Sequence, residues 1–304
     1  MKLRDERRFG LGASLRLAGS SVLMFFNPWT ASQIVGQALG QLIAALRARG
    51  RPPPAIARIH LPVRGKWRVY RGGNTRETSH SWSLLSQRYA YDLVSVDTSG
   101  RRFRPPGRHA RDFFTMGMPV HSPVAGRVCA VRDDCRDFPH AGLGWTDWRT
   151  RDLRGNHVLI EADSGLYVLL AHLSRGSVAV APGERVVVGQ VLGRAGNSGN
   201  TTEPHVHIHV QDRASFSTAV GVPLVFEGAR IERPSDDDGP SWPKEDDFVE
   251  WDESAKPASD FAVPKVSSAD VMHAALTCVG NIVAVFVLWR ALFRGLLWLF
   301  HRSA

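Results

Sequence analysis

Cysteine is scarce in this chain of 304 residues, which contains only Cys129, Cys135 and Cys278. No Cys-x-x-Cys pair occurs, so a zinc knuckle is excluded and any metal site must be built from histidine and carboxylate. Cys129 and Cys135 are close enough in sequence to close a small disulfide loop in an oxidising compartment, or they remain free. Cys278 stands in an apolar run, where we expect it to be a buried small hydrophobe.

Recognition motifs for nucleic acid are also missing, although the net charge is +9. The charge is unevenly placed, because residues 234–260 hold ten acids against two lysines, a local charge of −8 that leaves +17 elsewhere. A body this basic favours a polyanionic surface such as an envelope, a membrane leaflet or a nucleic acid. Charge alone does not choose among them, and without an RNA- or DNA-binding signature we expect no nucleic-acid partner.

The first segment, residues 1–54, is expected to lie outside the main domain. It begins with basic residues and an apolar run at 17–26, which is too short to span a bilayer and resembles a signal-peptide core or an interfacial segment. Residues 32–46 then repeat apolar side chains at helical spacing, which predicts an amphipathic helix. This helix either docks on its own domain or lies on the membrane. Its glutamines share a separate face: Gln33, Gln37 and Gln41.

The main domain, residues 58–233, consists of short β-branched runs separated by Gly, Pro and Asn. Many short strands with turn signals between them predict a mainly β fold, an antiparallel sheet or sandwich. We expect residues 133–154 to form a long surface loop over one edge. The expected strands are 67–70, 89–96, 126–131, 157–161, 167–170, 185–188 and 205–210.

The C-terminal part divides into an acidic segment, 234–268, and an apolar segment, 269–302. The acidic segment is too polar to build a core, which predicts a disordered linker. Residues 271–289 contain no Asp, Glu, Lys or Arg, and a helix of this length covers about 28 Å. We therefore expect a transmembrane anchor with a basic tail, with a buried core helix as the alternative.

The charges around this anchor predict its orientation. Arg290, Arg294 and Arg302 follow the apolar segment, whereas acidic residues precede it. The positive-inside tendency then places the C-terminus in the cytoplasm and the β-domain outside. The expected localisation is a single-pass protein of the cell membrane.

Three alternate histidines, His205, His207 and His209, follow a glycine-rich turn that begins at Gly196. On a strand these side chains share one face at a spacing of about 7 Å. Such an alternation suits metal ligands, although it also occurs on ordinary polar faces.

Further motifs precede the histidine strand in a fixed order. They are Pro119 to Val128 with Ser122 in an alanine position, Gly155-Asn-His-Val-Leu-Ile160, Ala171-His-Leu173, Val180 to Gly193, and Pro204-His-Val-His207. This series resembles the lysostaphin-type (LytM-domain) zinc peptidases, which cut peptide bonds in bacterial peptidoglycan, and it covers residues 67–211. The hairpin at 180–193 also resembles biotinyl and lipoyl carrier domains. Those carriers need a modifiable lysine, and none occurs between Lys66 and Lys244.

The resemblance implies a role for each matched side chain. Asp92 and His207 would be zinc ligands, whereas His172 and His205 would be the catalytic pair. Zinc with about three protein ligands and an open position lowers the pKa of its bound water to near 7. Neighbouring histidines then serve as general base and acid near neutral pH.

One position departs from the family pattern. The family has a histidine four residues before the ligand aspartate, and here that position holds Arg88, whose guanidinium cannot ligate zinc. His80 is the candidate third ligand, if residues 79–82 pair as a strand with 89–92. Arg88 would otherwise pair with Asp92 and occupy the metal site, or bind a substrate carboxylate.

Other polar residues near these motifs are expected to play lesser roles. His209 is predicted to be a rim or second-shell residue, and Glu203 to support a second-shell hydrogen bond. His121 and His157 occupy variable motif positions, so we expect both at the surface.

The leading hypothesis is a membrane-anchored zinc endopeptidase that acts on peptidoglycan cross-links or stem peptides. Because of Arg88, the alternative is a degenerate domain that binds wall peptides or regulates another hydrolase. A third option is a structural envelope protein whose basic surface adheres to anionic polymer.

Overall fold

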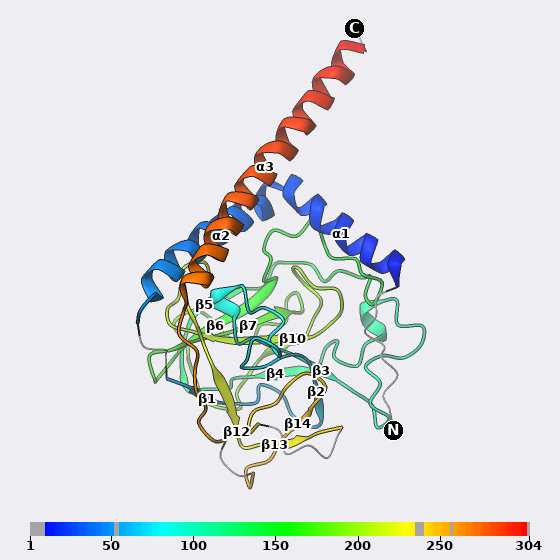
Figure 1. Cartoon of the computed structure of the whole chain (residues 1–304). Coiled ribbons are helices and arrows are strands. Elements are labelled where there is room, and N and C mark those ends of the chain that lie inside the picture. Colours follow the sequence, from blue (N-terminus) through cyan, green and yellow to red (C-terminus); the bar gives the residue numbers. More distant parts are fainter. Residues whose placement is uncertain (1–9, 52–54, 235–239, 256–257, 303–304) are drawn as a thin grey trace.

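The computed structural model describes residues 10–51, 55–234, 240–255 and 258–302. Figure 1 shows a β-rich body with three helices gathered at one end, and the last helix extends beyond the body. The helices are α1 (Leu11–Phe26), α2 (Pro28–Ala48) and α3 (Ser268–Arg302), with 3-10 turns η1 (Leu85–Gln87) and η2 (Ala110–Asp112). The mainly β, antiparallel fold that the sequence predicts is confirmed.

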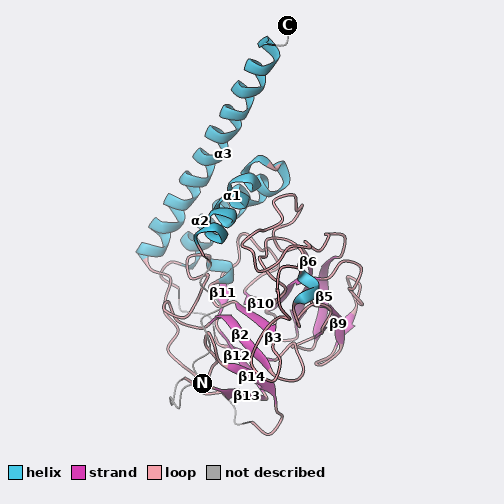
Figure 2. Cartoon of the chain, turned by 90° about the vertical axis from the view of Figure 1, so that its right-hand side faces the viewer, coloured by secondary structure: helices cyan, strands magenta, loops and turns pink. Residues whose placement is uncertain are grey.

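The central sheet follows the order β13-β14-β2-β3-β10-β7-β6-β5-β8, and every pairing within it is antiparallel. Its strands are β2 (Trp67–Gly72), β3 (Tyr91–Ser95), β5 (Gly126–Arg132), β6 (Asn156–Ala162), β7 (Tyr167–Leu173), β8 (Arg185–Val186), β10 (Val206–Gln211), β13 (Ala229–Glu232) and β14 (Phe248–Trp251). The two-residue β11 (Gly221–Val222) pairs with β10. Smaller sheets join β1 (Ala57–His60) to β12 (Leu224–Glu227) and β4 (Pro119–His121) to β9 (Val191–Arg194). Figure 2 shows the strands below the helices.

The alternation of side chains along the central strands separates an apolar core from a polar face. On β3 the side chains of Tyr91 and Leu93 belong to the main core, and on β10 that of Ile208 does the same. Asp92 and His207 lie between these positions, so they point to the opposite face of the sheet. Both are nevertheless buried, because loops and α2 cover that face.

The expected long loop at 133–154 contains no strand. It packs on the glycine turn that precedes the histidine strand, where Asn197 donates to the Phe138 carbonyl at 2.7 Å. The backbone N–H of Asn197 also donates to Asp137 Oδ1 at 2.8 Å. Cys129 and Cys135 are both free in this structure, and Cys278 is buried as predicted.

Helix α2 docks its polar face on the body and turns apolar side chains outward. The Gln33 amide donates to the Arg151 carbonyl at 2.7 Å, and Gln41 accepts a hydrogen bond from the Leu85 N–H at 2.5 Å. Leu39, Ile43 and Leu46 are exposed on the far side. The structure thus shows the docked arrangement, one of the two that the sequence allowed.

The expectation of a disordered linker over 234–268 is wrong for part of that segment. Strand β14 pairs with both β13 and β2, and extends the central sheet. Val249 and Trp242 are buried, and the Asp247 carboxylate is inside as well. Apolar side chains interspersed with the acids provide enough buried surface to fix this segment, which a count of charges does not reveal. Residues 235–239 and 256–257 lie outside the described part.

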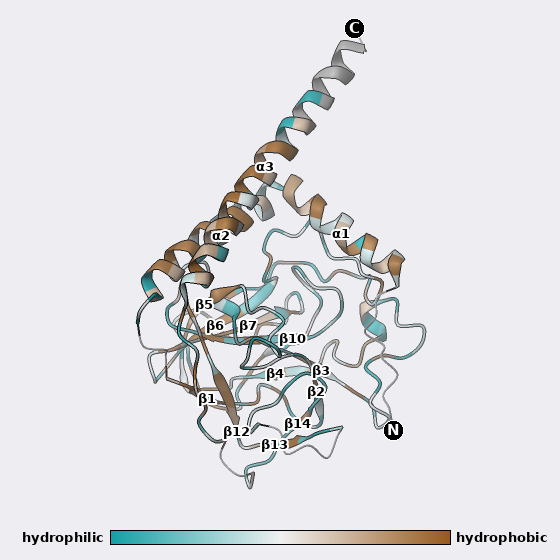
Figure 3. Ribbon diagram, in the orientation of Figure 1, coloured by the Kyte–Doolittle hydropathy of each residue, from teal (hydrophilic) through white to brown (hydrophobic). Residues whose placement is uncertain are grey.

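Helix α3 runs beside α2 before it leaves the body (Figure 1). Residues Ser268–Ala291 form the one helix within the described ranges that is long and apolar enough to cross a membrane, and 11% of its most apolar window is buried. In Figure 3, brown marks the many hydrophobic residues of α2 and α3 along the ribbons of both helices. The Trp289 indole donates to the Phe25 carbonyl at 2.8 Å, so α3 also contacts the end of α1.

Candidate metal and catalytic centre

Asp92 and His207 are direct partners across β3 and β10. Their side chains leave the sheet on the same face, and His207 Nδ1 lies 2.8 Å from Asp92 Oδ1. Both side chains are buried. Two adjacent strands therefore bring together residues that are 115 positions apart in sequence.

His80 reaches the same carboxylate from a turn. Its Nε2 lies 3.4 Å from Asp92 Oδ2, and the side chain is 17% exposed although the residue as a whole is at the surface. The predicted strand at 79–82 is wrong, since these residues form turns. The hydroxyls of Ser79 and Ser81 donate to the carbonyls of Arg88 and Gln87, both at 2.6 Å. These short-range bonds satisfy the backbone locally, which removes the need for a strand ladder.

Arg88 does not enter the metal site, which contradicts the suggestion that it pairs with Asp92. Its guanidinium is buried, donates to the Trp82 carbonyl at 3.0 Å and pairs with Asp270 at 2.5 Å. Asp270 lies in the first turn of α3. Arg88 therefore joins the His80 turn to the C-terminal helix.

His172 faces the site because its backbone departs from the strand conformation. Ala171 lies opposite His207, so regular alternation would turn the next side chain to the other face. The φ angle of His172 is 62°, in the left-handed region that non-glycine residues seldom occupy. The imidazole thus returns to the site, with its ring centroid 4.7 Å from that of His205.

Hydrogen bonds to backbone carbonyls set the tautomers of His172 and His205. His172 Nδ1 lies 2.8 Å from the Ser198 carbonyl, and His205 Nδ1 lies 2.9 Å from the Glu203 carbonyl. A carbonyl oxygen only accepts, so each Nδ1 carries the proton and each Nε2 keeps its lone pair. The Glu203 side chain has another role, since it pairs with Arg102 at 2.8 Å.

A chain of hydrogen bonds along one face of β10 sets the tautomer of His207. The Gln211 amide nitrogen donates to the Arg213 carbonyl at 2.8 Å, so its Oε1 accepts from His209 Nε2 at 2.9 Å. His209 Nδ1 must then accept from His207 Nε2, also at 2.9 Å. In its neutral form, His207 therefore turns the lone pair of Nδ1 toward the Asp92 carboxylate. Two buried acceptors that face each other require a proton or a cation between them.

The ionisation of the surrounding groups suits a cation. Burial acts to raise the pKa of Asp92, but the neighbouring imidazoles of His80, His205 and His207 outweigh it and hold the pKa well below its usual value. Burial lowers the pKa of His80, and it lowers that of His172 well below the ordinary range, with the charges of His205 and His207 adding to it. Carboxylate and neutral imidazole are the forms that bind metal.

Two groups of three side chains have the spacing of a metal site, with ligand atoms within 4.8 Å of one another. One group is His80, Asp92 and His207, and the other is His172, His205 and His207. The first contains the facing acceptors of Asp92 and His207, and its two nitrogens and one oxygen match the donors that zinc prefers. The residues present therefore fit a zinc ion.

A pocket of about 150 Å³ lies against the histidines, between the body and α2, and both His172 and His207 line it. Gln37 contributes from α2, and its amide nitrogen is buried without a hydrogen-bond partner among the described residues. Leu153 and Arg154 line the opposite wall and continue into a second hollow of about 360 Å³.

Sequence reasoning did not find Gln211, Ser198 or Gln37. Gln211 continues the alternate positions of the histidine strand, so its place on the same face was readable from the sequence. The roles of Ser198 and Gln37 depend on long-range packing and left no such signal. Of the two places expected for His209, the structure shows the one behind His207 and not the rim, since its side chain is buried against that ring. The expectation for His157 is wrong, because this residue is buried and not at the surface.

Comparison with known proteins connects this centre to one peptidase family. The sequence profile described as Peptidase family M23 matches residues 109–218. The chain is 28% identical over 156 residues to the glycyl-glycine endopeptidase ALE-1 of Staphylococcus capitis, covering 49% of this chain and 36% of that protein. It is 28% identical over 148 residues to the peptidoglycan DD-endopeptidase ShyA of Vibrio cholerae, covering 45% and 30% respectively. The chain thus spans about a third of the length of these curated relatives.

Solved structures give more distant matches. The catalytic domain of lysostaphin from Staphylococcus simulans is 18% identical, with 52% of this chain and 88% of that chain covered and a TM-score of 0.30. An M23 peptidase structure from Pseudomonas aeruginosa is also 18% identical, with 58% and 54% covered and a TM-score of 0.30.

Proposed function

We propose that this chain, which contains a Peptidase family M23 domain, is a membrane-anchored zinc endopeptidase that hydrolyses peptide bonds in peptidoglycan. The convergence of His80, Asp92 and His207 beside His172 and His205 supports this proposal most directly. Two relatives whose names specify peptidoglycan DD-endopeptidase and glycyl-glycine endopeptidase activity support the substrate class.

His80 Nε2, the Asp92 carboxylate and His207 Nδ1 would hold the zinc. When bound, zinc would polarise a peptide carbonyl and lower the pKa of a water molecule. Asp92 joins the two histidines through separate oxygens, Oδ1 toward His207 and Oδ2 toward His80. His209 and Gln211 hold the His207 ring in the ligating tautomer.

His172 and His205 supply proton transfer in this proposal. Both present an unprotonated Nε2 because their Nδ1 protons are held by carbonyls. His205 Nε2 lies 3.6 Å from Asp92 Oδ1, close enough to accept a proton from a water molecule beside the carboxylate. His172 lies next to His205 and, through its own unprotonated Nε2, would accept a hydrogen bond that orients this water. The proton that His205 takes up would then pass to the leaving amine.

The position of Arg88 bears on the alternative function of a degenerate binding or regulatory domain. An arginine in the metal site would block zinc, but this arginine pairs with Asp270, and His80 Nε2 lies 3.4 Å from Asp92 Oδ2. The feature that motivated the alternative therefore does not favour it.

The membrane part of the proposal relies on α3 alone. The helix has the length and composition of a span, and Arg290 and Arg294 follow its apolar part. The positive-inside tendency would place the catalytic domain outside the cytoplasm, where peptidoglycan lies. Membrane fractionation together with protease protection of intact cells tests this placement.

The enzyme proposal is tested with the full chain in detergent. Zinc content and the release of muropeptides from purified cell walls are measured for the native protein, His80→Ala and His172→Ala. We expect His80→Ala to lose both zinc and activity, and His172→Ala to lose activity while it keeps zinc. Wall binding without any hydrolysis or zinc in the native protein would instead establish the binding module.

A further inference from the structure

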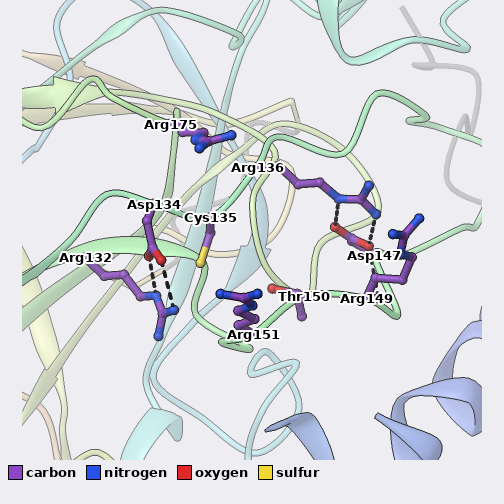
Figure 4. A pocket seen from close by; sticks show the side chains of 9 residues that line it. All are labelled: Arg132, Asp134, Cys135, Arg136, Asp147, Arg149, Thr150, Arg151 and Arg175. Atoms are coloured by element: carbon purple, nitrogen blue, oxygen red, sulfur yellow. Dashed lines mark hydrogen bonds and ion pairs between the residues drawn. The ribbon is translucent and has the colours of Figure 1, made fainter.

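A second polar pocket, distinct from the histidine centre, opens in the long loop. Its volume is about 360 Å³, within the range of about 300–1,000 Å³ for small-molecule sites. Five arginines and two aspartates line it, a net charge of +3, together with Cys135 and Thr150. Figure 4 shows these side chains, and the arginines are Arg132, Arg136, Arg149, Arg151 and Arg175.

The two aspartates are already paired. Asp147 is buried and accepts two hydrogen bonds from Arg136, at 2.7 and 2.6 Å. Asp134 pairs with Arg132 at 2.8 Å. Dashed lines mark both pairs in Figure 4. Neither carboxylate therefore remains to neutralise the other arginines of the pocket.

Arg149, Arg151 and Arg175 keep their guanidinium groups free of any carboxylate among the described residues. All three are exposed, and that of Arg149 lies only near the Trp148 ring, at 6.0 Å from its centroid. Three like charges around one hollow produce a positive potential that an anion relieves. Guanidinium groups match phosphate oxygens in pairs of hydrogen bonds, which makes phosphate the best-fitting anion.

The backbone that carries two of these arginines is held in place before any ligand arrives. The Thr150 N–H donates to the Asp147 carbonyl at 3.0 Å, and the Thr150 hydroxyl donates to the Asp152 carbonyl at 2.9 Å. From the helical end, the Asn27 amide donates to the Thr150 carbonyl at 2.8 Å, and Gln33 holds Arg151 as described above. A preorganised pocket loses less entropy when it binds.

We propose that this arginine pocket, which Arg149, Arg151 and Arg175 line together with the Arg136–Asp147 pair, binds a phosphate-bearing ligand. The ligand is either the phosphate headgroup of an anionic lipid or a soluble phosphate compound. Trp29 and Trp148 are exposed beside the pocket, as aromatic side chains are at membrane interfaces. The site does not depend on the proposed peptidase activity, although Leu153 and Arg154 of the same segment line the pocket at the histidines.

The test compares the native full chain with a triple variant, Arg149→Gln, Arg151→Gln and Arg175→Gln. Binding of inorganic pyrophosphate is measured by calorimetry in detergent. The protein is also placed in nanodiscs of phosphatidylcholine with or without phosphatidylglycerol, and protection of the loop is measured by hydrogen exchange. A control with the same loss of charge is Arg127→Gln, Arg185→Gln and Arg230→Gln, at exposed positions of β5, β8 and β13 that do not line the pocket.

Each charge-assisted hydrogen bond changes affinity by about tenfold or more, so we expect at least a hundredfold loss for the triple variant and little change for the control. Pyrophosphate binding that needs the three arginines assigns a soluble phosphate compound. Loop protection that needs both phosphatidylglycerol and the three arginines assigns a lipid headgroup. Absence of both effects, or equal losses in the control, overturns the proposal.

Two further variants keep the result interpretable. The three arginines form no ion pair with any described residue, so their replacement by glutamine should leave the melting temperature nearly unchanged. The corresponding triple lysine variant should restore part of the affinity, because lysine keeps the charge but not the paired donors. His205→Ala should bind pyrophosphate like the native protein. A failure of the peptidase proposal would therefore leave this measurement intact.

Discussion

The histidine centre and the arginine pocket are two polar hollows with opposite requirements. At the first, hydrogen bonds from the strand and turn leave lone pairs of His207 and Asp92 facing each other, so the site needs a cation. At the second, three guanidinium groups share a hollow whose carboxylates are already paired, so the site needs an anion. The comparison shows that the pairing of each charged group, more than the count of charges, determines which ligand a hollow attracts.

The largest expected effect is a loss of hydrolysis when the histidine centre is changed. His205→Ala removes a proton-transfer group, so kcat/KM for cell-wall hydrolysis should fall by about 10²- to 10⁴-fold. Zinc content should stay the same because His205 is not in the proposed ligand set. Turbidity loss of purified walls and metal analysis measure the two quantities. If activity survived the substitution, the assignment of His205 would fail.

The next effect concerns His157, which lies in β6 opposite Arg132 of the arginine pocket. Burial, and then the charge of Arg154, lower its pKa from 6.5 to about 4. Between pH 6.5 and about 4, the His157 imidazole is therefore protonated in the unfolded chain but neutral in the folded chain. Stability should be complete above pH 6.5 and should decrease by about 3 kcal/mol as the pH falls toward 4.

Urea unfolding at several pH values tests this prediction. His157→Gln should flatten the dependence between pH 6.5 and 4, whereas His140→Gln, at an exposed position, should leave it in place. An unchanged slope in His157→Gln would show that other groups cause the dependence.

A smaller effect, on zinc affinity, is expected at His209, which contacts the proposed ligand His207. His209→Leu removes the acceptor that orients His207, so zinc affinity should weaken by about 10- to 100-fold. Competition with a chelator measures the dissociation constant, and His121→Leu provides a control outside the centre. Equal affinities in the native and His209→Leu proteins would mean that the ring of His207 is held by other contacts.

The smallest effect is expected at Gln37, which lines the histidine pocket from α2. Gln33 and Gln41 fasten α2 to the body, whereas the amide nitrogen of Gln37, between them, has no partner within the described ranges. A bound peptide carbonyl would accept from it, so Gln37→Ala should raise KM by about three- to tenfold with little change in kcat. Leu39→Ala, on the exposed face of α2, is the matched control. A fall in kcat alone would place Gln37 in the chemistry instead.

Much of the histidine centre was predictable because its residues match the motif positions of the family that the sequence resembles. Asp92 and His207 occupy matched positions of ordered motifs, and antiparallel pairing makes them neighbours. His80 was identified as a candidate, but through a strand that does not exist. The serine hydroxyls that shape its turn act over six to nine residues, a range where many turn conformations compete.

The arginine pocket was not predictable from the sequence beyond an excess of positive charge. Arg149 and Arg151 are near neighbours, but Arg175 comes from a turn after β7, and the loop must fold back to bring it to the same hollow. Whether each arginine forms an ion pair with a carboxylate also depends on how this loop folds back. A net charge gives no information about such pairing.

The sequence by itself determined the β fold, the strands that carry Asp92 and His207, and the apolar length of α3, because each follows from local periodicity or composition. Only the tertiary structure decided that β14 joins the sheet, that Arg88 pairs with Asp270, and that a left-handed backbone returns His172 to the site. These outcomes depend on contacts between segments that are far apart in sequence. The free energy of such contacts cannot be read from the periodicity of a single segment.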